Sequence, residues 1–276
     1  MRKLAELGYL EGKNIVIERR SAEGNAQRLN EFAADLVRQQ VDVIVTAGTP
    51  AGFAAKQASG TIPIVLGANS DPVGIGLVAS LARPGGNVTG LSNQSTDLAG
   101  KQIESLREMI PRLRRLAILA NIGTPISVLD LREVQAGAGA LGLSVVALEI
   151  RRAEDIEPAF AALDHRADAL FVSPDPLVNT HRVRINTLAL SARLPTMHTF
   201  RESVEAGGLM SYGPNFPELY RRAAAFADKI LRGARPADIP VEQPTNFEMV
   251  INLKTARAIA HEIPASLVLR ADKIID

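Results

Sequence analysis

The stretch Asp42-Val43-Ile44-Val45-Thr46-Ala47-Gly48-Thr49-Pro50 decides the fold. Residues 43–45 are apolar and β-branched without polar alternation, which is typical of a parallel strand covered on both faces. Thr49 is then expected to be the N-cap of a helix, with Pro50 as its first residue. Gly48 allows the backbone to come close to a group bound at the turn. The stretch therefore predicts a buried strand that leads directly into a helix N-terminus.

The same pattern returns at Asp168-Ala169-Leu170-Phe171-Val172-Ser173-Pro174-Asp175-Pro176. An aspartate comes first, an apolar strand follows, a hydroxyl residue ends the strand, and Asp175 with Pro176 begins a helix. The chain thus contains an internal repeat and consists of two similar units. Because expected strands alternate with expected helices around both stretches, we predict an α/β fold with two Rossmann-like lobes, each a doubly wound parallel sheet.

Composition excludes several classes of protein. The 276 residues exceed one typical core and favour two domains. A hydrophobic content of 46% and a charged content of 22% exclude a wholly disordered chain. The net charge of +1, without a basic run interleaved with aromatics, gives no reason to expect nucleic acid as a partner. The absence of cysteine excludes disulfides, a thiol nucleophile and Cys-ligated metals.

The ligand site is expected at the carboxyl ends of the strands. In doubly wound sheets ligands bind beyond these ends, where helix N-termini point, and two lobes in one chain place a cleft between them. Helix capping alone also explains Thr49 and Asp175, and core packing alone explains Phe200 and Tyr212. The candidate ligand-binding residues are Thr46, Gly48, Thr49, Pro50, Asn69, Asp71, Asn93, Asn121, Ser173, Asp175, Phe200 and Tyr212.

The boundaries of the two lobes follow from the order of expected elements. Lobe one is assigned residues 1–93 plus 201–244, and lobe two residues 94–200 plus 245–276. The chain would then cross between the lobes near Asn93, Phe200 and Thr245. Three such crossings are expected to form a hinge that closes the lobes around a ligand.

The two copies differ at their beginnings. The second copy opens with an apolar strand at residues 116–119, but no counterpart precedes the strand expected at residues 14–18. We therefore expect the natural protein to be longer at its N-terminus, with an export signal and this strand, since no signal peptide is visible at Met1. In a sheet of order 2-1-3-4-5 the first strand lies in the middle. Lobe one should accordingly show a gap or a substitute strand between residues 14–18 and 43–46.

Several segments together resemble a known family. They are LGYLEGKNI (7–15), DPVG (71–74), LARPGGNVTG (81–90), EAGGLMSYG (205–213), ILRG (230–233), VEQP (241–244) and AD (271–272). With these segments spread over nearly the whole chain, the sequence resembles the ABC transporter substrate-binding proteins of the tryptophan- and tyrosine-type group, which have the type I periplasmic-binding-protein fold.

The resemblance implies a receptor and not an enzyme. Its members are periplasmic or membrane-anchored outside the cytoplasm, and they deliver a small solute to an ABC permease in the membrane. For this chain the resemblance implies a small-molecule ligand, namely an amino acid or an aromatic acid. It also implies a monomer that uses no cofactor, no metal and no catalytic residues.

Two other classes remain open from the residues themselves. Gly74, Gly76 and Ala79 fit the spacing of a dinucleotide fingerprint and would suit a Rossmann-type enzyme with a nucleotide cofactor, but they do not directly follow a strand. The four histidines, at positions 165, 181, 198 and 261, lack the spacing of metal ligands. The third class is the effector-binding domain of a sensor or regulator, although the chain carries no helix-turn-helix.

The two helix N-termini predict the chemistry of the ligand. At Thr49 a neutral cap and free backbone N–H groups favour a carboxylate, because a helix N-terminus carries partial positive charge. At the matching place in the second copy, Asp175 suits an ammonium group. The pair therefore indicates a zwitterion, and hence an amino acid, whose side chain Phe200 or Tyr212 would cover.

Overall fold

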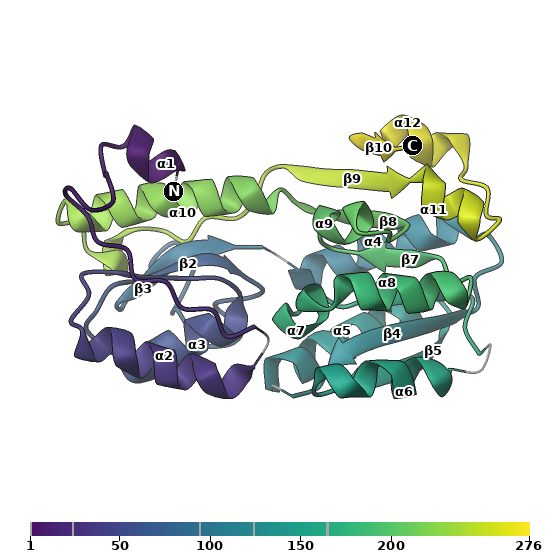
Figure 1. The fold of residues 1–276 in the computed structure, drawn as a ribbon, viewed down its shortest axis with the longest axis horizontal. Helices are drawn as coiled ribbons and strands as arrows, with labels where there is room; N and C mark the ends of the chain where they lie inside the picture. The colour runs from purple at the N-terminus through teal and green to yellow at the C-terminus, as the bar shows by residue number, and fades with distance from the viewer. Residues whose placement is uncertain (1, 24, 94, 124, 164–165) are drawn as a thin grey trace. The chain divides into compact units, whose positions relative to one another are not determined.

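The computed structural model describes residues 2–23, 25–93, 95–123, 125–163 and 166–276, which fold into two α/β units (Figure 1). Unit 1 consists of Met1–Gln94 and Asn215–Thr245, and unit 2 of Ser95–Pro214 and Asn246–Asp276. The chain passes from one unit to the other three times. In the described ranges no helix is long and apolar enough to cross a membrane.

Unit 1 is built on a sheet of three parallel strands in the order β1-β2-β3. Its core is apolar and joins the strands to α3 and to Val241 near the end of the unit. The elements are α1 (Arg2–Glu6), α2 (Ala26–Arg38), β1 (Ile44–Thr46), α3 (Thr49–Ala58), β2 (Ile64–Asn69), β3 (Val88–Ser92), α10 (Phe216–Leu231) and the 3-10 turn η2 (Pro236–Asp238).

Helix α10 shows how the sequence of unit 1 determines its packing. Asn215 caps the helix, because its side-chain oxygen accepts a hydrogen bond from the Glu218 N–H at 3.0 Å. Apolar side chains then recur at helical spacing from Leu219 through Phe226 to Ile230, and all of them are buried. This face packs on β2 and β3. Helix α10 comes late in the sequence and returns the chain to the first sheet.

Unit 2 contains a seven-stranded sheet in the order β10-β9-β8-β7-β6-β4-β5. All pairs are parallel except β8–β9, which is antiparallel. The sheet is therefore mixed, whereas the sequence predicted a wholly parallel one. The strands are β4 (Arg115–Asn121), β5 (Ser144–Ile150), β6 (Ala169–Val172), β7 (Thr196–His198), β8 (Met210–Pro214), β9 (Phe247–Asn252) and β10 (Lys273–Ile275).

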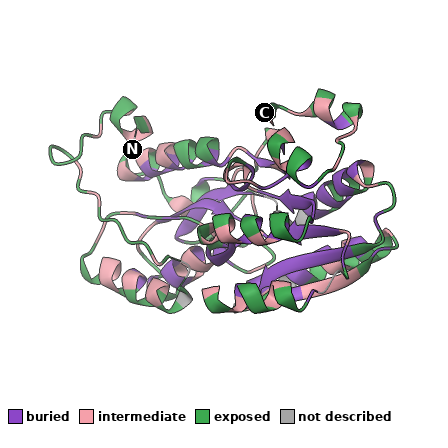
Figure 2. Ribbon diagram, turned by 45° about the vertical axis from the view of Figure 1, so that its right-hand side comes forward, coloured by how far each residue is buried: buried purple, intermediate pink, exposed green. Residues whose placement is uncertain are grey.

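Helices cover both faces of this second sheet. Strand β4 shows the arrangement, because Leu116 and Ile118 belong to one apolar cluster while Ala117 and Leu119 belong to the other. The first cluster includes α4 (Ser95–Met109), α5 (Pro125–Ala140), α11 (Leu253–Ala258) and α12 (Ala265–Arg270). The second includes α6 (Ile156–Ala161), α7 (Pro176–Thr180) and α8 (Arg182–Ser191). The central strands are accordingly buried along their length (Figure 2).

The second crossing between the units lies later than predicted. Residues 201–244 were expected in lobe one, but residues 201–214, with α9 (Arg201–Glu205) and β8, belong to unit 2. Strand β8 pairs with β7 on one side and β9 on the other, which holds this segment in the second sheet. The other two crossings, after Gln94 and after Thr245, lie within one residue of the predicted positions.

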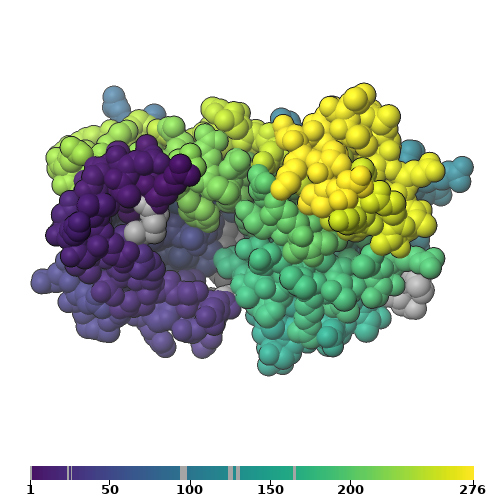
Figure 3. Space-filling view, turned by 45° about the horizontal axis from the view of Figure 1, so that its top comes forward, coloured from purple at the N-terminus to yellow at the C-terminus, as the bar shows by residue number. Residues whose placement is uncertain are grey.

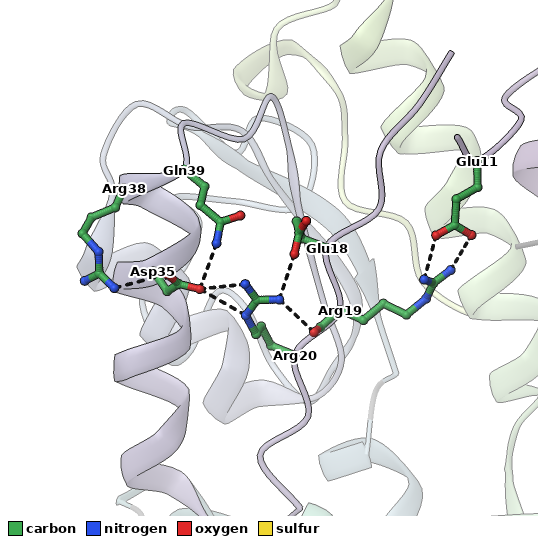
Figure 4. A network of polar contacts seen from close by, with 7 residues as sticks. All are labelled: Glu11, Glu18, Arg19, Arg20, Asp35, Arg38 and Gln39. Carbon is green, nitrogen blue, oxygen red and sulfur yellow. Dashed lines mark hydrogen bonds and ion pairs between the residues drawn. The ribbon is translucent and has the colours of Figure 1, made fainter. Parts of the chain in front are cut away.

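Residues 14–18 form no strand, so this part of the sequence prediction is wrong. The segment makes only a single bridge, between Glu11 and Ile15, and polar side chains hold it to the unit (Figure 4). Arg20 donates to the Asp35 carboxylate on α2 at 2.7 Å, and Arg19 donates to Glu11 at 2.8 Å. In the space-filling view the first residues of the chain lie on the surface beside α10 (Figure 3), where the Tyr9 hydroxyl donates to Asp228 at 2.9 Å.

Strand β1 pairs only with β2 among the described residues and is therefore an edge strand of its sheet. Residues 14–18 are not paired with it. Val45, in the middle of β1, is 52% exposed, although its neighbours Ile44 and Thr46 are buried. The run of apolar residues at 43–45 is therefore covered on one face only.

Candidate ligand-binding site

The turn after β1 places a helix N-terminus at the carboxyl end of the first sheet. Gly48 is the N-cap of α3, with φ +81° and ψ 160°, and no side chain caps the helix. Thr49 and Pro50 are its first two residues, so the predicted N-cap at Thr49 is one residue late. Such backbone angles are open to glycine and strained for other residues. Within the described chain, the N–H groups of Thr49 and Ala51 have no hydrogen-bond acceptor.

The Thr49 side chain ties this turn to the ends of the next two strands. Its Oγ1 accepts a hydrogen bond from the Ser70 N–H at 3.1 Å and lies 3.3 Å from the Ser70 Oγ. The Ser92 hydroxyl in turn donates to the Ser70 carbonyl at 3.1 Å. The Asn93 N–H donates to the Asn69 carbonyl at 2.7 Å. The side chains that contact this turn are therefore neutral hydroxyls and amides.

Two predicted residues of this edge have buried polar atoms without a partner. The Oγ1 of Thr46 and both side-chain atoms of Asn69 find none within the described residues, although buried polar groups are usually hydrogen-bonded. Asn69 lies against α3, since a Cβ on Gly52 would come within 2.7 Å of its Nδ2. Asp71 instead folds its own loop, because its Oδ1 accepts from the N–H groups of Val73 and Gly74.

The matching turn in unit 2 centres on Asp175, which is 6% exposed. Asp175 is the N-cap of α7, and its Oδ1 accepts hydrogen bonds from the Leu177 N–H at 2.8 Å and the Val178 N–H at 3.4 Å. Asn121, at the end of β4, donates its Nδ2 to the same oxygen at 3.1 Å. The Ser127 hydroxyl on α5 is 3.4 Å from Oδ2. Three elements of unit 2 therefore converge on this carboxylate.

Burial of Asp175 raises the pKa of its carboxyl group above the ordinary value for aspartate. The hydrogen bond from Asn121 and the N–H groups of α7 act against this effect because they favour the charged form. Ser173, two residues earlier, has a buried Oγ for which the described residues offer no partner. The edge of unit 2 thus contains an acidic group and an unpaired hydroxyl close together in the sequence.

The two predicted aromatic residues lie on or after the strands next in the sheet, since β7 pairs with β6 and β8 pairs with β7. Phe200 is the N-cap residue of α9 and is partly exposed. Tyr212, on β8, stacks on Phe247 of β9 with ring centroids 6.1 Å apart and packs against the first cluster of unit 2. Gln102 joins the two regions by donating to the Thr199 hydroxyl at 3.0 Å and to the Tyr212 carbonyl.

The structure therefore brings together part of the predicted set within each unit. Asn121 contacts Asp175 in unit 2, and Asn69 contacts Asn93 in unit 1. Sequence reasoning missed Ser127 and Gln102 as partners of predicted residues. Both lie on helices and are recognised only from tertiary contacts.

Other chemistries find little support in the described residues. They contain no group of three or more histidine, cysteine, aspartate or glutamate side chains that could hold a metal ion. Residues 72–79, which carry the glycine spacing of a dinucleotide fingerprint, form turns and begin no helix. Leu77 and Val78 enter the core of unit 1 from this loop. His165 lies outside the described residues.

A class of protein follows from this geometry: two α/β units, each with polar groups and a helix N-terminus at the carboxyl edge of its sheet, are typical of solute receptors. Three comparisons agree. Residues 1–275 match the family described as ABC transporter substrate binding protein. The tyrosine-binding protein of Clostridioides difficile is 28% identical over 259 residues, covering 94% of this chain and 74% of that protein.

Two solved structures share the fold closely. A conserved domain protein from Vibrio cholerae matches with a TM-score of 0.94 and 28% identity, covering 99% of this chain and 92% of that one. The ABC domain from Streptococcus pneumonia, in complex with L-Trp, matches with a TM-score of 0.90 and 28% identity, covering 99% and 93%. The chain therefore belongs to the ABC transporter substrate-binding protein family, and the predicted periplasmic-binding-protein fold is confirmed.

Proposed function

We propose that this receptor binds an amino acid through the carboxyl edges of both units. In this proposal the ligand carboxylate takes the free N–H groups at the start of α3, and the ligand ammonium takes Asp175. Thr46, Asn69, Asn93 and Ser173 supply neutral hydrogen bonds. Phe200 or Tyr212 covers the ligand side chain.

The observation that carries the proposal is the difference between the two helix N-termini. Gly48 leaves the first N–H groups of α3 open, and such groups with the helix dipole favour an anion. Asp175 occupies the N–H groups of α7 with its own carboxylate and is buried without a cationic side chain on it among the described residues. A buried carboxylate needs a positive partner to offset its desolvation. A ligand with one charge of each sign satisfies both turns.

The relatives support the class of ligand. One is named a tyrosine-binding protein, and one was solved in complex with L-Trp. Both names refer to an amino acid with an aromatic side chain. By extension we place this chain in an amino-acid importer, outside the cytoplasm in the periplasm or anchored to the membrane, where it passes its ligand unchanged to a permease.

The proposal is tested by removing one charge of the ligand at a time. Thermal unfolding would be followed with L-tryptophan and L-tyrosine, then with tryptamine, which lacks the carboxylate, and indole-3-propionate, which lacks the amine. A ligand at about 100 times its dissociation constant should stabilise the folded protein by about 2.7 kcal/mol. We expect stabilisation by an intact amino acid and at least tenfold weaker binding of both analogues.

Two outcomes would contradict the proposal. The first is that indole-3-propionate binds as tightly as tryptophan, which would leave Asp175 without a role in recognition. The second is that no amino acid stabilises the protein while another solute class does. Mass spectrometry of the ligand recovered after incubation would test separately whether it is chemically unchanged.

A further inference from the structure

The two oxygens of the Asp175 carboxylate have different surroundings. Oδ1 accepts three hydrogen bonds, from the Asn121 Nδ2 and from the N–H groups of Leu177 and Val178. Oδ2 has one long contact among the described residues, with the Ser127 hydroxyl at 3.4 Å. A carboxylate oxygen accepts about two hydrogen bonds, so Oδ1 is saturated and Oδ2 retains capacity. Any further donor to Asp175 is therefore directed to Oδ2.

Asn121 is itself held in one orientation. Its Oδ1 accepts a hydrogen bond from the Gly123 N–H at 2.8 Å, which leaves its Nδ2 to donate to Asp175. Gly123 comes close enough that a Cβ at that position would lie 2.9 Å from the Asn121 Oδ1. The amide therefore acts as a fixed bridge between the chain after β4 and the N-cap of α7, and it is the one side chain among the described residues that donates to Oδ1 of Asp175.

The described groups that face Asp175 are all uncharged. They are the Asn121 amide from β4, the Ser127 hydroxyl from α5, and the backbone N–H groups of α7. The nearest ionisable side chains along the chain are His181, Arg182 and Asp168. Arg182 donates its Nη1 to the Asn179 carbonyl, and Asp168 pairs with Arg115. Burial thus favours the protonated form of Asp175, and hydrogen bonds from neutral donors favour the ionised form.

We propose that Asn121 is a positioning residue for ligand recognition: it fixes Asp175 with Oδ2 available and favours the ionised carboxylate that a ligand ammonium requires. This inference rests on the proposed amino-acid function. Loss of the Asn121 amide would leave Asp175 in place on α7, because the two backbone N–H groups remain. It would remove a donor that stabilises the charged form, and Asp175 would accept a proton at higher pH.

The test compares Asn121→Ala with the unchanged protein over a range of pH. The dissociation constant for L-tryptophan would be measured by calorimetry from pH 5 to pH 9. Asn186→Ala is the matched control, since Asn186 is a buried asparagine of the same unit whose Nδ2 donates to the carbonyls of Ser203 and Ala206 and does not contact Asp175. Melting temperatures of all three proteins would establish that they are folded.

We expect the affinity of Asn121→Ala to fall further below that of the unchanged protein as the pH decreases. A hydrogen bond to a charged group corresponds to a pKa change of about one unit or more, so the ratio of the two dissociation constants should be about tenfold larger at low pH than at high pH. Asn186→Ala should change the constant by the same factor at every pH. A pH-independent ratio for Asn121→Ala would overturn the inference.

A second measurement needs no ligand. The carboxyl ¹³C signal of Asp175, identified by its absence in Asp175→Asn, would be titrated in the ligand-free proteins. We expect its midpoint about one pH unit higher in Asn121→Ala, and an unchanged midpoint would also overturn the inference. Failure of the unchanged protein to bind any amino acid would sink the proposed function, whereas binding together with an unmoved Asp175 midpoint would sink only the role of Asn121.

Discussion

The two copies of the strand-to-helix turn use one backbone plan with opposite chemistry at the cap. In unit 1 Gly48 caps α3 without a side chain and leaves N–H groups open. In unit 2 the Asp175 side chain fills the equivalent N–H groups of α7 and adds a negative charge. Since the dipole of a helix favours an anion at its start, the first turn can take that anion from a ligand, whereas the second already contains it. The residue at the cap therefore decides which ligand charge the turn favours: a negative group beside Gly48 and a positive group beside Asp175.

The copies also differ one strand further along. Pro63 and Pro195 precede corresponding strands of the two copies. Leu66 of β2 therefore corresponds in sequence to His198 of β7. Both residues are buried, and each is approached closely by a glycine, Gly90 in the first case and Gly208 in the second. Unit 1 thus has an apolar side chain where unit 2 has an imidazole whose Nε2 finds no partner among the described residues.

The largest expected effect is the acid sensitivity of His198. Complete burial lowers the pKa of His198 from 6.5 to about 3. Between pH 6.5 and pH 3 the unfolded chain binds a proton at His198 that the folded chain does not bind. The contribution of His198 to the free energy of unfolding is therefore highest above pH 6.5 and decreases as the pH falls toward 3. The loss approaches about 1.4 kcal/mol per pH unit. His198→Leu gives unit 2 the residue that unit 1 has at this position. The free energy of unfolding of this variant should depend less on pH between pH 6 and pH 4 than that of the unchanged protein. An equally steep pH dependence in urea titrations would refute the burial of a neutral His198.

Asp175→Asn should separate affinity from stability. Asparagine keeps an acceptor for the N–H groups of α7 but cannot pair with an ammonium, so affinity for an amino acid should fall roughly 10- to 150-fold. Because burial raises the pKa of Asp175, its ionisation at neutral pH disfavours the ligand-free fold. The melting temperature without ligand should therefore stay the same or rise at pH 7. Calorimetry and thermal unfolding measure the two effects, and an amino-acid affinity within twofold of the original would contradict the comparison.

Gly48→Ala should damage the first turn through its backbone. The positive φ of Gly48 is strained for alanine, at about 1–3 kcal/mol, and relief of that strain would turn the N–H groups of α3. We expect lower stability together with weaker binding of ligands that carry a carboxylate. Gly12→Ala is the control, because Gly12 also has a positive φ, in the same unit, with nothing near its missing Cβ. Equal losses of affinity in both variants would show that the turn has no special role.

The smallest effect should come from the Thr49 hydroxyl. Thr49→Val removes the acceptor of the buried Ser70 N–H, which should cost about 1 kcal/mol of unfolding free energy. Thr49→Ser keeps the hydroxyl and should stay close to the original stability in urea titrations. If valine and serine behave alike, the link between the ends of β1 and β2 contributes nothing measurable.

Sequence reasoning located the parallel strands because their apolar runs are continuous, and it placed Asn121 and Asp175 at carboxyl ends. It did not show that they touch, since the contact joins residues 54 positions apart. It also placed residues 201–214 in the wrong unit, because alternation of strands and helices does not say which sheet a strand joins. The strand expected at residues 14–18 did not form, because these residues find no neighbouring strand to pair with among the described residues.

The attachment of that N-terminal segment has a practical consequence for handling the protein. Its contacts with α2 and with itself are exposed or half-exposed ion pairs, such as Arg20–Asp35 and Arg19–Glu11, and Val16 is 79% exposed. Salt screens pairs of this kind, whereas the sheet below is held by buried apolar surface. Local opening of the segment should therefore precede unfolding of unit 1, most readily at high ionic strength. A protease that cuts after arginine should then cleave at Arg19 or Arg20 before unit 1 unfolds.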